Sequence, residues 1–156
     1  MIIDDVITCV ARKQTPVILT RFKEHAKFLH DALKEKADHV FLLYGDNSDK
    51  ENAEIRVKLK QIPENESLIL VATGQKIGEG FDFPRLDVLM LAAPVSFEGR
   101  LEQYVGRLNR DYVGKEAVYV YDYIDSHVRY FDKNVCKKIE NIQEDGIFNL
   151  DARVAT

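Results

Sequence analysis

The chain has 156 residues, of which 46% are hydrophobic and 31% charged, and its formal net charge at pH 7 is −4. This composition is typical of a globular domain with a proper core and excludes a disordered chain. The negative net charge argues against a protein that binds polyanions through a basic surplus, but phosphate recognition by backbone N–H groups remains open.

Membrane and metal functions find little support in the sequence. No apolar run is long enough to cross a bilayer, and no basic N-terminal region precedes an apolar stretch. We therefore expect a cytoplasmic protein with no membrane partner. Cys9 and Cys136 are far apart and lack metal-ligand spacing, and the four histidines are scattered, which predicts free thiols and no metal site.

The first half of the chain alternates apolar runs with helical periodicity. Residues 1–15 predict a leading helix and linker, which could be truncated from a longer segment. Continuous apolar runs predict strands buried on both faces at 16–22 and 39–45. The helix between them carries one apolar stripe, formed by Phe22, Ala26, Leu29 and Leu33. Ser48 or Asp49 could cap the next helix, whose apolar residues are Ile55, Leu59 and Ile62 and which Pro63 ends.

The second half continues the same alternation. Three more apolar runs predict strands at 67–73, 87–94 and 117–124. A helix is predicted at 101–115, another begins near Ser126, and residues 146–156 are expected to form a C-terminal tail. Strands that alternate with helices indicate parallel βαβ units. We predict one α/β domain over 16–145, with a parallel sheet of about five strands and helices on both faces.

Ligands of an open parallel sheet bind beyond the carboxyl ends of its strands. The polar and glycine residues at these predicted ends are therefore site candidates, together with the loops near Asp82 and Pro94. The candidates are Thr20, Arg21, Tyr44, Gly45, Thr73 and Gly74.

A glycine-rich segment, VATGQKIGEGFDFP, follows the third predicted strand. Thr73 offers a hydroxyl, the amides after Gly74 could face a phosphate, and Asp82 could accept hydrogen bonds from a sugar or orient an arginine. The glycines could also be simple turn residues. The segment is not a dinucleotide fingerprint because Phe81 follows Gly80, and the chain contains no Walker-type phosphate loop.

The predicted helix at 101–115 has two distinct faces. Leu101, Tyr104, Val105 and Leu108 would be buried, while the opposite face would present Gln103, Gly106, Arg107 and Arg110. A solvated face paired with nearby carboxylates is the plain alternative. A glycine inside a helix costs about 1 kcal/mol, which favours close approach of a ligand at this face. Two arginines suit planar recognition of phosphate oxygens.

Together these segments resemble the C-terminal RecA-like lobe of superfamily 2 helicases and translocases. The stretch QYVGRLNR matches the Q-x-x-G-R-x-x-R pattern of motif VI, and VATGQKIGEGFD looks like motif V. PVILTRF and LLYGD lie where motif IV and a short intervening motif would lie. The nearest branch is the DEAD/DEAH-like one that includes restriction-enzyme motor subunits and excision-repair helicases.

The resemblance assigns roles to individual residues. Arg110 would be the arginine finger that reaches the γ-phosphate of ATP, Arg107 would assist it, and Gln103 would couple the nucleotide to the interface. Gly80, Asp82 and Gly106 would lie near the nucleotide or the seam between lobes, and Thr20, Arg21, Gly45, Thr73 and Gly74 would line the strand-binding surface. ATP and Mg²⁺ would be held mainly by a separate N-terminal RecA-like lobe. Tyr104 departs from the motif, where many relatives carry an arginine.

These expectations leave three hypotheses. The first is the C-terminal motor lobe of an ATP-dependent helicase, inactive as an ATPase alone, and the branch favours DNA over RNA as its strand. The second is a stand-alone, non-catalytic RecA-like module that binds nucleic acid or a partner protein. The third is an unrelated α/β enzyme with Asp82 on a ribose.

Overall fold

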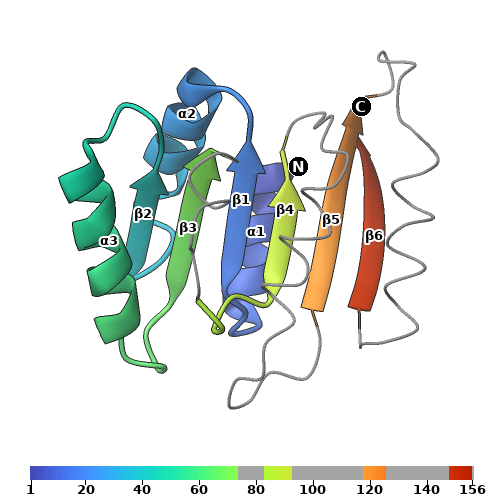
Figure 1. The fold of residues 1–156 in the computed structure, drawn as a ribbon. Coiled ribbons are helices and arrows are strands. Elements are labelled where there is room, and N and C mark those ends of the chain that lie inside the picture. The colour runs from blue at the N-terminus through green and yellow to red at the C-terminus, as the bar shows by residue number, and fades with distance from the viewer. Residues whose placement is uncertain (74–82, 93–117, 126–147, 156) are drawn as a thin grey trace.

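The computed structural model describes residues 1–73, 83–92, 118–125 and 148–155, arranged as one sheet with helices packed on it (Figure 1). The helices and strands follow one another along the chain as α1 (Ile2–Ala11), β1 (Pro16–Thr20), α2 (Lys23–Leu33), β2 (His39–Leu43), α3 (Asp49–Gln61), β3 (Leu68–Thr73), β4 (Val88–Leu91), β5 (Val118–Asp125) and β6 (Phe148–Ala155). The predicted helices at 101–115 and from Ser126 lie outside the described residues. None of the described helices is long and apolar enough to span a bilayer.

The six described strands form one sheet in the order β2-β3-β1-β4-β5-β6, and every neighbouring pair is parallel. This confirms the predicted α/β fold class and all five predicted strands. The sixth strand, β6, lies where we expected only a tail. Its apolar residues alternate with polar ones, which is itself a strand pattern that the prediction of a tail missed; they are Phe148, Leu150, Ala152 and Val154.

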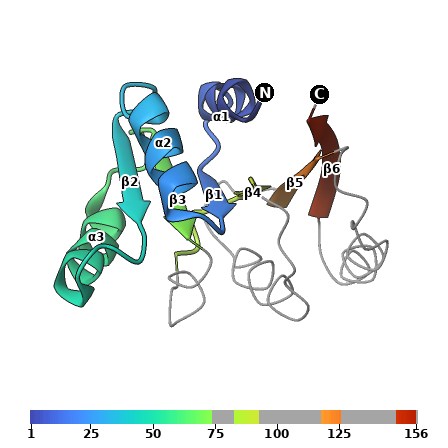
Figure 2. The same cartoon turned by 90° about the horizontal axis from the view of Figure 1, so that it is seen from above.

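The helices cover both faces of the sheet, with α1 and α2 on one face and α3 on the other (Figure 2). Alternate residues of one strand point to opposite faces of the sheet and therefore pack in different core clusters. Ile18 of β1 packs with the α1 and α2 residues, while Val17 and Leu19 pack in the cluster that contains Leu59 of α3. Because both faces are covered, the central strands β1, β3 and β4 are buried along their whole length.

Two sequence-based expectations need correction. Four of the five β2 residues are only half-buried, because β2 is an edge strand. Phe22 does not belong to the buried stripe of α2, although Ala26, Leu29 and Leu33 do. Phe22 is the N-cap, its backbone is extended (φ −100°, ψ 128°), and its side chain is 59% exposed.

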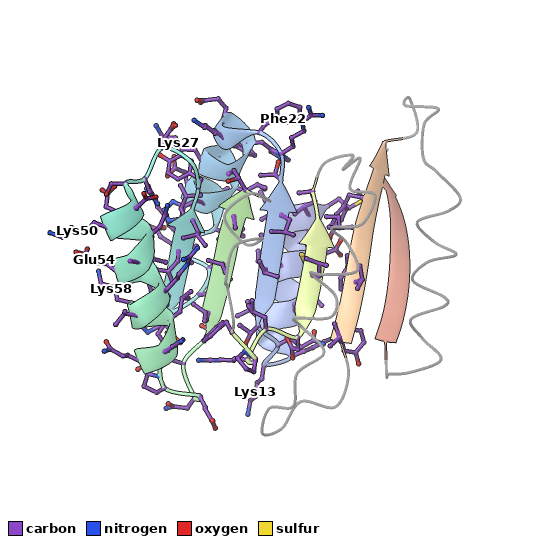
Figure 3. All side chains as sticks on the ribbon, viewed as in Figure 1. Lys13, Phe22, Lys27, Lys50, Glu54 and Lys58 are labelled. Atoms are coloured by element: carbon purple, nitrogen blue, oxygen red, sulfur yellow. The ribbon has the colours of Figure 1, made fainter. Side chains whose placement is uncertain are left out.

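Helix α3 begins at a capping box, as its sequence predicts. The Ser48 hydroxyl accepts the Glu51 backbone N–H at 3.2 Å, and the Glu51 carboxylate accepts the Ser48 N–H at 2.6 Å. These bonds lower the pKa of Glu51. Lys50, Glu54 and Lys58 form a solvated stripe on its outer face (Figure 3). The helix ends at Gln61, before Pro63.

Helix α1 ends in a Schellman motif whose left-handed position is occupied by Lys13. Gln14 N–H bonds the Cys9 carbonyl and Lys13 N–H bonds the Val10 carbonyl, both at 3.0 Å. Lys13 has φ 61°, a conformation that strains a residue with a Cβ atom.

Lys13→Gly should therefore stabilise the chain by about 1 kcal/mol, since glycine adopts this conformation without steric strain. Thermal unfolding followed by circular dichroism should show Tm rising by about 2–4 °C. Lys34→Gly is the control, because Lys34 caps α2 with an ordinary right-handed backbone (φ −55°, ψ −22°). The control should lower Tm; a rise of the same size in both variants would refute the strain at Lys13.

Candidate nucleic-acid interface

The carboxyl ends of β1, β2 and β3 lie side by side at one edge of the sheet (Figure 1). Thr20 ends β1 and Thr73 ends β3, and the two are partners in the parallel register. Gly45 follows β2 by two residues. Three segments that are far apart in sequence therefore bring Thr20, Thr73, Gly45 and the adjacent Arg21 to the same edge.

Thr20 is buried at this edge and holds the turn between β1 and α2. Its side chain is 1% exposed, its hydroxyl is hydrogen-bonded to His25 Nδ1 at 3.0 Å, and it accepts the Phe22 backbone N–H at 3.4 Å. Burial lowers the pKa of His25, which favours the neutral ring. Thr73 is also largely buried. The two buried threonines therefore support the backbone at this edge, and other side chains form its exposed surface.

That outer surface carries four consecutive exposed residues, Arg21, Phe22, Lys23 and Glu24, at the start of α2. No side chain caps the N-terminus of α2. The uncapped backbone N–H groups and the helix dipole add positive potential beside the exposed Arg21. This part of the edge is suited to contact an anionic strand.

The loops after β1 and β2 are joined by an ion pair that the sequence does not reveal. Lys23 Nζ lies 2.5 Å from Asp46 Oδ1, and this contact raises the pKa of Lys23. A Cβ atom on Gly45 would lie 3.1 Å from Lys23 Cε, so the glycine leaves room for the lysine chain. Both partners are half-exposed, so the pair organises the loops more than it stabilises the fold.

The remaining candidates lie outside the described residues: Gly74, Gly80, Asp82, Gln103, Gly106, Arg107 and Arg110. Their roles at a nucleotide remain predictions. Within the described part of the chain, no three His, Cys, Asp or Glu side chains are grouped so that they could hold a metal ion.

The strand order and the parallel register define a RecA-like lobe of the kind found in superfamily 2 helicases. The family model for the helicase conserved C-terminal domain matches residues 1–111, and the chain belongs to this family. The matched span contains every candidate residue of motifs IV to VI.

Known proteins of related sequence include two from viruses. The chain is 32% identical over 99 residues to "Transcript termination protein A18" of Yaba-like disease virus, a match that covers 64% of this chain and 20% of that protein. It is 41% identical over 69 residues to "Uncharacterized protein 108L" of Invertebrate iridescent virus 3, covering 44% and 62% of the two chains. The chain thus spans about a fifth of the length of the poxvirus relative.

Solved structures of similar fold come from the same superfamily. T4 UvsW superposes with a TM-score of 0.64 and 21% identity, covering 99% of this chain and 33% of that chain. Domain 2 of the DEAD-box helicase Mss116p, solved bound to an RNA duplex, gives a TM-score of 0.60 and 18% identity, covering 99% and 56%. At these identities the likeness establishes the fold.

Proposed function

We propose that this chain is the C-terminal motor lobe of an ATP-dependent helicase or translocase, and that it supplies a strand-binding edge and an arginine finger to a nucleotide held by another lobe. The observation that carries the proposal is the meeting of Thr20, Gly45 and Thr73 at one edge of the sheet. These residues belong to three separate segments that resemble helicase motifs, and the family match spans all three.

The residues proposed to contact the nucleotide belong to motifs V and VI. Bound ATP with Mg²⁺ supplies the phosphoryl group whose transfer to water drives the motor. Arg110 and Arg107 would stabilise the charge that develops on the phosphate oxygens, while Gln103, Gly106, Gly80 and Asp82 would line the seam.

At the nucleic acid, Arg21 is the candidate whose exposed side chain a strand would meet first, and Thr20 would act through the turn it holds. DNA is the proposed strand, because the segments resemble the restriction-enzyme and excision-repair branch. The relatives named as transcript termination proteins support a role on nucleic acid during transcription. Matched DNA and RNA oligonucleotides in one binding assay would separate the two substrates.

Calorimetry with ATP and Mg²⁺ tests the proposal that the nucleotide is held by the N-terminal lobe and not by this lobe. This chain alone should show no tight ATP site and no hydrolysis, whereas joining it to its N-terminal lobe should produce strand-stimulated hydrolysis. Tight ATP binding by this lobe alone would favour a different nucleotide enzyme. Strand binding without any hydrolysis in the joined protein would favour a non-catalytic module.

Thr73→Ala should weaken coupling to the strand in the joined protein. Because Thr73 is buried where β3 ends, beside Thr20, its truncation should disturb the backbone that the strand contacts, and we expect strand-stimulated hydrolysis to fall by up to about tenfold. Hydrolysis without a strand should change little. Thr8→Ala is the control, since the exposed Thr8 hydroxyl donates to the Asp4 carbonyl of its own helix at 2.9 Å. Unchanged strand binding and stimulation in Thr73→Ala would contradict the placement of Thr73 at the strand.

A further inference from the structure

The exposed position of the Phe22 side chain is not explained by a contribution to the stability of the fold. It is 59% exposed at the carboxyl end of β1, above the sheet (Figure 3), and it packs in neither core cluster. It also occupies the N-cap of α2, where Ser, Thr, Asp or Asn would stabilise the helix by about 1 kcal/mol more. A residue that breaks a local rule without a compensating contact is expected at a functional position.

The backbone of Phe22 is nonetheless fixed. Its N–H donates to the Thr20 hydroxyl, its carbonyl accepts the Ala26 N–H at 3.0 Å, and Thr20 is in turn bonded to His25. The ring is therefore presented from a rigid turn, so that little backbone entropy is lost when it contacts a partner.

The surroundings of the ring identify the chemistry of that partner. Arg21 precedes it and is exposed, whereas Lys23, which follows it, is paired with Asp46, and the next residue is the exposed Glu24. Arg21 and the uncapped end of α2 are therefore the cationic features beside the ring. The other exposed phenylalanine of α2, Phe28, is six residues away, which places it about 120° around the helix. The two rings therefore do not form one apolar patch of the kind that binds a protein partner. An isolated aromatic face beside an exposed arginine and a helix N-terminus fits a nucleobase with its phosphate.

We infer that Phe22 stacks on a base of the bound single strand, while Arg21 and the N-terminus of α2 contact the adjacent phosphate. This rests on the proposed function, because the strand must first reach this edge. The inference adds a contact with bases to the contact with phosphates. The stacking contact should tolerate any base sequence, since every base has a π-face.

Tryptophan fluorescence provides a direct test, because the chain contains no tryptophan. Phe22→Trp keeps an aromatic ring at the position, and its emission should be quenched as oligothymidylate is added. Phe28→Trp is the matched control, since Phe28 is 62% exposed on the same helix, and its emission should not change. Equal quenching in both variants, or none in Phe22→Trp while the strand binds, would overturn the inference.

Affinity measurements with two probes complete the test. Phe22→Ala and Phe22→Leu should each bind oligothymidylate about 5- to 150-fold more weakly. Both should bind an abasic oligonucleotide of the same length as the native chain does, and circular dichroism should show an intact fold. An equal loss on both probes, or no loss on either, would rule out stacking. If the native chain binds neither probe, the proposed function fails and the inference with it.

Discussion

Arg110→Ala, made in the protein that joins this lobe to its N-terminal lobe, should leave ATP binding nearly unchanged and lower strand-stimulated ATP hydrolysis by about 10³- to 10⁵-fold. An arginine finger contributes little to the ground state, because the charge it neutralises develops on the phosphate oxygens only as the phosphoryl group is transferred. The loss should therefore appear in kcat, with the Kd for ATP nearly constant. Single-turnover hydrolysis and nucleotide titration measure the two quantities separately.

Two further variants make the interpretation of Arg110→Ala specific. Arg110→Lys should remain strongly impaired, since an ammonium group lacks the planar fork of guanidinium. Arg12→Ala, at an exposed position after α1, should hydrolyse ATP at the native rate. Retention of strand-stimulated hydrolysis in Arg110→Ala would remove this residue from the mechanism. An equal loss of ATP binding and hydrolysis would make it a binding residue instead.

Arg85→Ala should destabilise the fold by about 3 kcal/mol, without any part in the chemistry. The guanidinium is almost fully buried where α3 ends, and it donates to the carbonyls of Ile62 at 3.4 Å, Pro63 at 3.2 Å and Glu66. Removing it leaves these carbonyl groups without their charged donor and opens space between α3 and the turn before β4. Urea unfolding followed by circular dichroism should show a lower midpoint with an unchanged slope.

Arg85→Lys should give an intermediate loss, because one ammonium group cannot satisfy three carbonyls in the same geometry. Arg12→Ala again serves as the control and should change the free energy of unfolding by less than about 0.5 kcal/mol. Native stability of Arg85→Ala would show that the carbonyls find other partners after α3.

Much of the fold follows from short-range patterns in the sequence. Continuous apolar runs identify β1, β3 and β4 because both faces of these strands are buried. The Ser48 capping box is encoded within four residues and forms as expected. Motif spacing indicates the helicase family, which the match over residues 1–111 confirms. The placement of Thr20 and Thr73 at one edge follows once the strands are known to be parallel.

Other features depend on contacts that no local pattern contains. Phe22 fits the apolar stripe of α2 by spacing, yet the chain turns at Thr20 and leaves the ring exposed. The alternating residues of β6 are typical of a strand, but only the pairing shows that it lies parallel beside β5.

Apolar periodicity, capping and motif spacing were enough to predict the fold class, the helicase family and most element positions, because these patterns involve neighbouring residues. Contacts between distant side chains became evident only in the folded chain: Lys23 with Asp46, Arg85 with the end of α3, and Tyr123 of β5 with Asp5 of α1 at 2.8 Å. Such pairs depend on strand order and on the packing of helices over the sheet, and both are set by the burial of the whole core.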